Sequence, residues 1–212
     1  MYFKIQDELY EVEIVKKLTT KNTYIRVKDD LTIYVTTNTF VRDREIEKLL
    51  KQNTNSIMKM ISTKIKKEEY ENNFYFLGKK YDIVYTNDGL ITLGSDKVFL
   101  DKNIDIDKWY KKESTRIFKE RFDYNYQKFS RRIPYPSLNI RKMKTRWGVC
   151  NTKDIKVTLN LELIKKDISC LDYVINHELA HLIHANHSSL FWRVVEENYP
   201  KYKEIRKKLK DY

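Results

Sequence analysis

Alternating apolar and polar positions dominate the first hundred residues of the chain. This two-residue period, carried by β-branched and aromatic side chains, predicts β-strands with one buried face. The predicted strands cover residues 9–15, 23–27, 31–35, 74–77, 81–85 and 90–93. Turn residues follow three of these strands, at 28–30, at Gly78 and at 87–89, and the first and last of these turns predict β-hairpins.

Helical periodicity, with apolar residues three and four positions apart, marks most of the remaining sequence. The predicted helices cover 42–67, 105–130, 169–185 and 189–198, and a short basic helix follows over 201–212. Pro134 and Pro136 end the long helix at 105–130. Two further strands, 137–140 and 155–159, are predicted on either side of the segment 145–150.

The change from strand-rich to helix-rich sequence lies near residues 100–104. No Gly/Ser-rich linker marks this change, so the two halves are expected to pack together. We therefore predict an α+β fold with a strand-rich N-terminal part, 1–103, and a helical domain with a small sheet, 104–212.

Positive charge is in excess, with 42 Lys and Arg residues against 30 Asp and Glu residues and a net charge of +12. Such an excess favours anionic partners, including nucleic acid. A Lys-rich surface without a specific partner is the favoured interpretation. The basic tail, 201–210, lacks a known nucleic-acid motif. A solvated helix is therefore the favoured interpretation of the tail, and a nucleic-acid contact is the alternative.

Cysteine usage and hydropathy indicate the cellular compartment. Cys150 and Cys170 are the only cysteines and form no CxxC pair, which excludes a disulfide scaffold and suits a reducing cytosol. The N-terminal segment has acidic residues and no apolar stretch of the kind found in signal peptides. No run of 18 apolar residues predicts a membrane span. We therefore expect a cytoplasmic protein.

The helix predicted over 169–185 contains the pattern H-E-x-x-H. Residues four apart share a helix face, so His177 and His181 can present ring nitrogens to one metal ion. Glu178 then lies beside the metal and can take a proton from a water that the metal activates. Zinc lowers the pKa of such a water to about 7. The pattern predicts a Zn²⁺ site with Glu178 as catalytic base.

A catalytic zinc site needs a third protein ligand and one open position. His184 lies seven residues after His177, about 10 Å along a continuous helix, which is too far to share the ion. His187 can return to the metal if the helix ends before it, for which Asn186 in a left-handed C-cap conformation and a Ser188 or Ser189 N-cap are suited. His187 is the favoured ligand. His184, Glu196 and Glu197 remain alternatives.

Two other interpretations of this segment remain. The histidines could lie on a solvated helix face and bind nothing, although all four histidines of the chain fall between 177 and 187. A structural zinc site would need a fourth protein ligand, such as Cys150, which would close the site. Neither interpretation accounts for Glu178 next to the first ligand.

Three segments resemble the YgjP-like metallopeptidases, a zincin branch related to SprT-like and WLM proteins. Thr145–Cys150 is similar to the family's T-R-W-G-S-C, with Val149 in place of the usual Ser, and Leu159–Leu163 is similar to its L-N-x-x-L. Leu171–Leu182, followed by H-S-x-x-F-W from His187, is similar to its metal-binding segment. The resemblance implies a zincin-like metallopeptidase domain with three histidine ligands, His177, His181 and His187, and a general base, Glu178.

Several neighbouring residues are candidates for substrate contacts. Arg146 could hold a substrate carboxylate or stabilise an oxyanion, whereas packing of Arg146 and Trp147 on the metal-binding helix is the favoured interpretation. Asn160 could bind a substrate backbone, although a cap of the following segment is favoured. The strand 155–159 could pair, as an edge strand, with an extended peptide.

Three further residues near the motif are expected to support the fold and not to contact substrate. Phe191 and Trp192 are expected in the core, and Asp172 is expected to complement a helix N-terminus.

The favoured function is a zinc-dependent metallopeptidase that acts on a peptide or protein. In this hydrolase, Glu178 takes a proton from a metal-activated water and passes it to the leaving amine. One alternative is a nucleic-acid-associated, SprT-like protease, which the net charge of +12 favours. The other is a non-catalytic interaction module stabilised by zinc, which predicts a fourth protein ligand.

Overall fold

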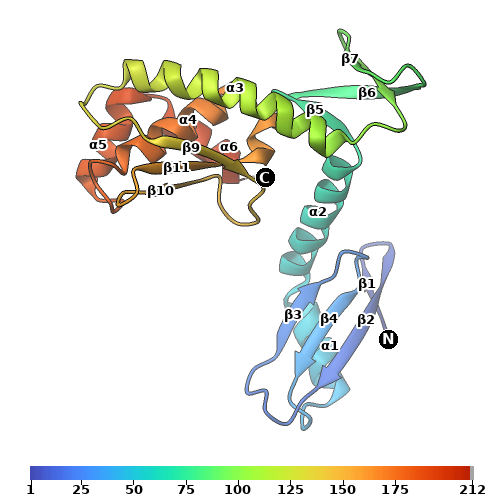
Figure 1. Ribbon diagram of the computed structural model, residues 1–212. Helices are drawn as coiled ribbons and strands as arrows, with labels where there is room; N and C mark the ends of the chain where they lie inside the picture. The colour runs from blue at the N-terminus through green and yellow to red at the C-terminus, as the bar shows by residue number, and fades with distance from the viewer. Residues whose placement is uncertain (211–212) are drawn as a thin grey trace. The chain divides into compact units, whose positions relative to one another are not determined.

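The computed structural model describes residues 1–210, and the chain forms two compact units that divide between Asn72 and Asn73 (Figure 1). The predicted α+β fold is confirmed, because helices and three small sheets make up the chain. The predicted division near 100–104 differs from this one, since the strands between 74 and 101 belong to the second unit. Asp211 and Tyr212, the end of the predicted tail, lie outside the described residues.

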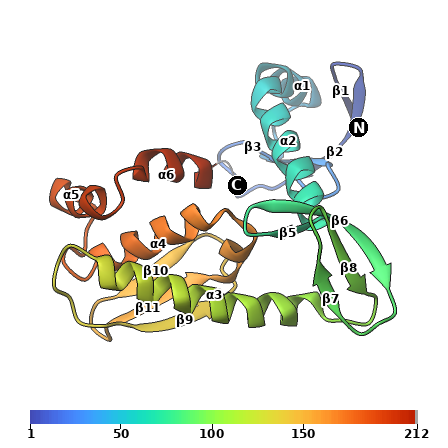
Figure 2. The same ribbon diagram turned by 90° about the horizontal axis from the view of Figure 1, so that it is seen from above.

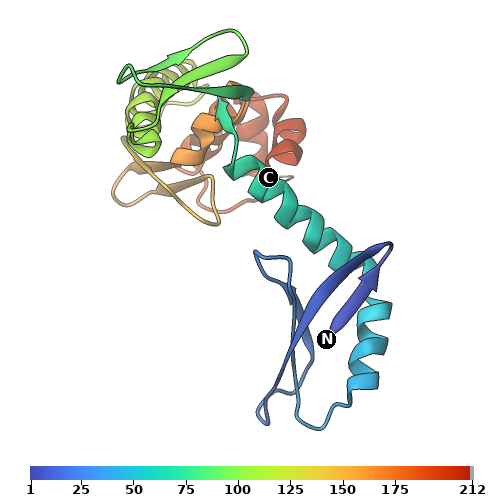
Figure 3. The same cartoon turned by 90° about the vertical axis from the view of Figure 1, so that its right-hand side faces the viewer.

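The first unit is a four-stranded sheet with two helices. Its elements are β1 (Tyr2–Ile5), β2 (Glu8–Lys16), β3 (Tyr24–Val27), β4 (Ile33–Thr37), α1 (Asp43–Gln52) and α2 (Thr54–Glu71). The strand order is β1-β2-β4-β3, and only β2 and β4 run parallel. Figure 3 shows α1 against one face of this sheet, where Ile46 and Leu50 are fully buried with Ile33 and Val35.

The helix predicted over 42–67 is interrupted at Asn53, which ends α1 and precedes α2. The Asn53 side chain donates to the Leu49 carbonyl at 2.8 Å. Asn side chains compete in this way with the regular backbone ladder, which explains why the apolar stripe continues while the helix does not. The predicted hairpin at 28–30 is confirmed, because β3 and β4 pair antiparallel across it.

The second unit begins with a four-stranded sheet of order β5-β6-β8-β7. Its strands are β5 (Phe74–Phe76), β6 (Lys79–Thr86), β7 (Ile91–Leu93) and β8 (Lys97–Asp101). The predicted hairpin at 87–89 is wrong, because β8 lies between β6 and β7 and pairs parallel with β6. The turn residues are present, but β6 and β7 each pair with β8 and not with each other.

The turn between β5 and β6 ties this sheet to the helical part of the unit. Leu77 N–H donates to the Ile164 carbonyl at 2.8 Å. Gly78 has a φ of +84°, and a Cβ there would lie 2.8 Å from Asp167 Cα, so the turn needs glycine for conformation and for space. The Phe74 ring also stacks on Tyr110. These contacts explain why 74–101 belongs to the second unit.

The remaining elements form a helical layer on a three-stranded sheet. They are α3 (Ile106–Lys128), β9 (Ser137–Arg141), β10 (Gly148–Asn151), β11 (Lys156–Asn160), the 3₁₀ helix η1 (Leu161–Lys165), α4 (Ile168–Ala180), α5 (Ser189–Asn198) and α6 (Tyr202–Lys210). The sheet order is β10-β11-β9. In Figure 2, α4 lies between α3 and α6, and α4 contacts β10 and β11. Among residues 1–210, no helix has the length and apolar character needed to cross a membrane.

A buried polar network joins α3 to α4. Arg121 donates two hydrogen bonds to the Asp172 carboxylate, at 2.8 and 2.6 Å. Asn125 donates to the same carboxylate at 2.8 Å, and Asn176 donates to Asn125 at 2.8 Å. Asp172 lies in the second turn of α4 and is 9% exposed, so the expectation that it complements a helix N-terminus is wrong. Its carboxylate instead fixes the orientation of α4 against α3.

We expect Asp172→Ala to destabilise the fold by about 2–3 kcal/mol, because it leaves the Arg121 charge and the Asn125 amide without their acceptor. The magnitude is below that of a fully buried pair, since the Arg121 side chain is 26% exposed. Urea unfolding measures the change. Arg116→Ala is a matched control, because it removes an exposed ion pair with Glu113 from the same helix and should change stability by less than about 1 kcal/mol. Equal effects of the two substitutions would contradict the structural role of the network.

Candidate metal centre

The helix α4 begins at a side-chain cap and ends at the second histidine of the H-E-x-x-H pattern. Asp167 accepts a hydrogen bond from Ser169 N–H at 2.8 Å and so caps the first turn. The last helical residue is Ala180, and His181 is the C-cap. Because most residues from 170 to 180 are buried, the helix lies inside the unit and is not a solvated helix face.

The chain leaves α4 through a tight turn, earlier than the helix predicted over 169–185. Ile183 N–H and His184 N–H both donate to the Ala180 carbonyl. No described residue from 181 to 187 has a positive φ, so the predicted left-handed cap at Asn186 is wrong. Tightening of the last turn, and not a left-handed residue, ends the helix. The predicted cap at Ser188 is confirmed, because its hydroxyl accepts from Phe191 N–H at 3.4 Å and α5 begins at Ser189.

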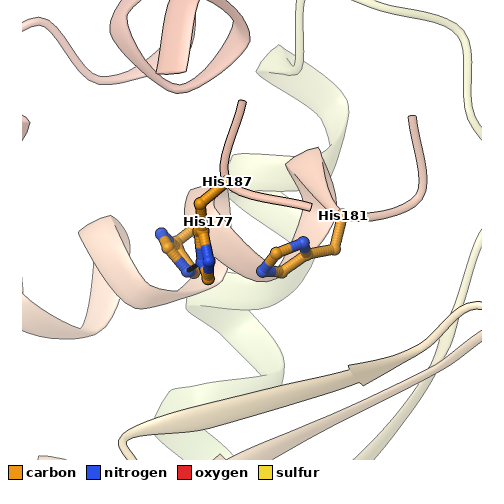
Figure 4. A group of neighbouring side chains, drawn as sticks. All are labelled: His177, His181 and His187. Atoms are coloured by element: carbon orange, nitrogen blue, oxygen red, sulfur yellow. Dashed lines mark hydrogen bonds between the residues drawn. The ribbon is translucent and has the colours of Figure 1, made fainter. Parts of the chain in front are cut away.

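This turn brings His187 back to the helix (Figure 4). Each of His177, His181 and His187 offers one ring nitrogen to a group whose atoms all lie within 4.8 Å of one another. His177 Nε2 and His187 Nε2 are 3.1 Å apart. Two imidazole nitrogens on one tetrahedral zinc ion, with Zn–N bonds of about 2.0–2.1 Å, would lie about 3.3 Å apart. The donor set therefore fits a small divalent metal.

Phe191 supports the three imidazoles from α5. Its ring centroid lies 4.9, 4.5 and 4.9 Å from the ring centroids of His177, His181 and His187. The Trp192 ring stacks on His187 at 5.6 Å and on Tyr202 of α6 at 5.4 Å. The core role predicted for Phe191 is confirmed, since it is fully buried. Aromatic packing thus restricts the rotation of the histidine rings.

His184 contributes its backbone and not its ring. His181 Nδ1 lies 3.2 Å from the His184 carbonyl oxygen, which accepts the Nδ1 proton and leaves the Nε2 lone pair of His181 free. The His184 ring is absent from the group of converging donors in the described residues. The sequence does not predict this bond, because it requires the tight turn after Ala180.

Burial keeps the imidazoles of His177 and His181 neutral. It lowers the pKa of His177 to about 3, and the nearby His181 and His187 act in the same direction. Burial also lowers the pKa of His181. Only neutral imidazole has the lone pair that a metal needs, so these rings remain available as ligands at neutral pH.

Glu178 lies beside the group on α4 and is 4% exposed. Burial raises its pKa to about 8, whereas a hydrogen bond from Cys150 N–H and the charge of Arg146 oppose this rise. The strand β10 crosses directly over the carboxylate at Gly148, where a Cβ would lie 2.5 Å from Glu178 Oε1 and 2.7 Å from Cγ. Only glycine allows the strand to approach so closely.

The other candidate ligands lie apart from the three histidines. Glu197 pairs with Arg131 at 2.9 Å, and Glu196 lies 3.9 Å from Lys203. Burial raises the pKa of Cys150 to about 11, so this residue stays a thiol, which is a poor ligand. Among the described residues, no fourth Cys, His, Asp or Glu joins the group. In this part of the chain the group thus has three protein donors, one fewer than a structural zinc site uses.

A cleft of about 740 Å³ opens onto the three histidines and Glu178. Its other lining residues come mainly from the segment 145–150, from α4 and from α6, and they include Arg146, Trp147, Tyr173 and Arg206. Arg206 is not among the site residues that the sequence predicts. The sequence feature that could have indicated the packing of α6 is the apolar spacing of Tyr202, Ile205 and Leu209. These three side chains are buried and fix α6 on the unit. The tail is thus only partly solvated, contrary to the prediction.

Arg146, Trp147 and Asn160 have different roles. Arg146 is exposed on the cleft wall. Trp147 is half-buried and donates from Nε1 to the Leu209 carbonyl at 3.2 Å, so it packs on α6 and not on α4 alone. Asn160 is buried and caps η1 by accepting from Glu162 N–H at 3.2 Å, as favoured by the sequence.

The remaining bonds of Asn160 hold the loop that precedes β10. Its amide donates to the carbonyls of Met143 and Arg146 at 2.9 and 2.8 Å, and its side-chain oxygen accepts from Met143 N–H. The bonds of this buried side chain thus all support the loop and η1. The predicted edge strand 155–159 is also wrong, because β11 is central and β10 is the edge that lines the cleft.

Comparison with known proteins gives one family match. The family model described as YgjP-like, metallopeptidase domain, matches residues 21–212. Two solved structures are similar to part of the chain. The metallopeptidase zymogen abylysin of Pyrococcus abyssi is 27% identical over 43% of this chain and 90% of its own, with a TM-score of 0.40. The zymogen jannalysin of Methanocaldococcus jannaschii is 22% identical over 43% and 92%, with a TM-score of 0.39. No protein with curated annotation matches the chain.

We expect His187→Ala to lower the affinity for zinc by at least about 100-fold, because it removes one of three converging donors. His184→Ala should leave the affinity within about threefold of the wild type, since its backbone carbonyl remains. Isothermal titration calorimetry of the metal-free proteins with zinc measures the affinities of both variants. Loss of affinity in His184→Ala alone would contradict the ligand set.

Proposed function

Because the chain belongs to the YgjP-like family of metallopeptidases, we propose that it hydrolyses peptide bonds with one bound zinc ion. His177, His181 and His187 would hold the ion, and Glu178 would serve as the general base. One observation carries this proposal: three imidazoles converge beside a buried carboxylate at the floor of a cleft.

The donor set favours zinc among the divalent metals. Imidazole nitrogen is a borderline ligand that suits zinc and its neighbours better than calcium or magnesium. When bound, such an ion supplies a Lewis acid that polarises a carbonyl and acidifies water. Three protein donors would leave one position of a tetrahedral ion for water or substrate, which is typical of catalytic and not of structural zinc.

Glu178 would perform the proton transfers. Its carboxylate would accept a proton from the attacking water and donate that proton to the leaving amine nitrogen. Burial under β10 supports this role, because it raises the pKa of Glu178 to about 8 and so makes the carboxylate a stronger proton acceptor than an exposed one. The Cys150 N–H bond holds the carboxylate in a single orientation beside the histidines.

The edge strand β10 would align the substrate. Its pairing with β11 leaves its other edge without a partner strand in the described sheet, and that strand lines the cleft. An extended peptide can add to such an edge through main-chain hydrogen bonds. Its scissile bond would then pass over the floor that the three histidines and Glu178 form.

The central test is Glu178→Gln. We expect hydrolysis of peptides to fall at least about 1000-fold, because glutamine cannot accept the proton. Zinc content should remain near one ion per chain, since the three donors are unchanged. A mixed peptide library analysed by mass spectrometry reports cleavage, and elemental analysis reports the metal. Undiminished cleavage by the zinc-loaded variant would remove Glu178 from the mechanism.

A second test concerns the close approach of β10 to the carboxylate. We expect Gly148→Ala to lower kcat/KM at least about 10-fold while zinc content is kept, because the new methyl group would displace Glu178. Glu178 is buried, so its side chain has little room to move aside. Steady-state kinetics on the peptide that is cleaved best measures kcat/KM, and a circular dichroism spectrum checks that the variant is folded. Wild-type kinetics in a folded variant would show that the approach is not needed.

A further inference from the structure

The charges that line the cleft are unevenly distributed. Arg146 and Arg206 are basic, and Glu178 is the only acidic residue among the lining side chains. Glu178 lies on the floor beside the histidines, where it is assigned to proton transfer. The walls therefore present two guanidinium groups and no carboxylate to a substrate.

The position of Arg206 is fixed by its surroundings. Its guanidinium lies over the Trp192 ring, 4.6 Å from the centroid. The helix that carries it is held by the buried side chains of Tyr202 and Leu209 and by the bond from Trp147 Nε1 to the Leu209 carbonyl. A guanidinium held against an aromatic face keeps its hydrogen-bond donors free for another group.

Arg146 lies on another part of the wall, in the segment 145–150, and its backbone is fixed in a different way. The Asn160 amide bonds to the Arg146 carbonyl at 2.8 Å and so fixes its backbone. Trp147, the next residue, connects this segment to α6. The two arginines thus belong to two segments that contact each other through one hydrogen bond.

Neither arginine has an acidic partner within salt-bridge distance among the described residues, whereas basic neighbours outside the cleft do. Lys203, on the same helix as Arg206, lies 3.9 Å from Glu196. Lys142, in the same loop as Arg146, lies 3.4 Å from Glu162. A solvated surface of a chain with net charge +12 would explain exposed arginines, but not their place on the walls of one cleft.

We propose that Arg146 and Arg206 bind a carboxylate of the substrate, so that the protein cleaves peptides next to this carboxylate. The guanidinium fork matches a carboxylate in shape and charge, and aromatic and aliphatic walls strengthen the attraction. The carboxylate comes from an Asp or Glu side chain or from a free C-terminus. The proposal rests on the peptidase function proposed above and adds the class of its substrate.

The test measures binding and cleavage separately. Four fluorescent peptides share one sequence, with either a Glu or a Gln pair at its centre and with either a free or an amidated C-terminus. Fluorescence anisotropy gives their affinity for the zinc-loaded Glu178→Gln protein, which should bind without cleavage. Arg206→Gln and Arg146→Gln are added to this background. Lys207→Gln, an exposed residue of α6 outside the cleft lining, is the matched control.

We expect a peptide with a carboxylate to bind about 10- to 100-fold more tightly than the amidated Gln peptide, as for a charge-assisted hydrogen bond. Arg206→Gln and Arg146→Gln should each reduce this preference at least fivefold, and Lys207→Gln should leave it unchanged. Preference for the Glu pair assigns the carboxylate to a side chain. Preference for the free C-terminus assigns it to the chain end.

Equal binding of all four peptides, or a preference that both arginine variants retain, would overturn the proposal. It would also be overturned if a 20-nucleotide single-stranded DNA displaced the peptides and lost affinity in Arg206→Gln, since the arginines would then serve phosphate. Cleavage by the wild-type protein separates the two proposals. Cleavage without acidic preference supports the peptidase function and contradicts the carboxylate site. Arginine-dependent binding of carboxylates without any cleavage supports the carboxylate site and contradicts the peptidase function.

Discussion

The three imidazoles can converge only because the helix that carries two of them ends at the second. One more turn of α4 would carry the chain away from His177, and His187 could not return. The tight turn after Ala180 therefore sets the site, and the hydrogen bond that His181 Nδ1 donates to the His184 carbonyl leaves Nε2 as the free nitrogen of that ring. The Ser188 cap then directs α5 so that Phe191 packs under all three rings. Helix termination and ligand geometry are one feature here.

A second constraint comes from the sheet. The strand β10 lies so close to Glu178 that only a glycine fits at 148, and this contact removes the carboxylate from water. Burial then raises the pKa of the carboxylate, and the hydrogen bond from Cys150 N–H fixes its orientation. Beneath α4, the network of Arg121, Asn125 and Asp172 prevents the helix from rotating away from the strand. The position of the Glu178 carboxylate thus depends on contacts to both neighbouring layers.

The sequence predicted local features well and distant partners poorly. The motif and its spacing identified the histidines, and periodicity identified α5 to the residue. The hairpin at 87–89 and the edge at 155–159 were wrong, because a third strand enters each sheet, and local periodicity does not encode which strands pair. The break at Asn53 and the contacts of Asp172 needed side-chain geometry. Arg206 was missed because its role depends on where α6 packs, which the charge pattern of the tail does not encode.

The cleft is assembled from parts with separate sequence origins. Its floor comes from α4 and the turn that follows, whereas one wall comes from α6, the last described helix. Mutations in α6 can therefore change the wall without touching the three histidines or Glu178. During divergence within a family of such proteins, selectivity could evolve by exchange of the C-terminal helix while the chemistry at the floor stays constant. The same separation makes that helix a convenient segment for redesign of specificity.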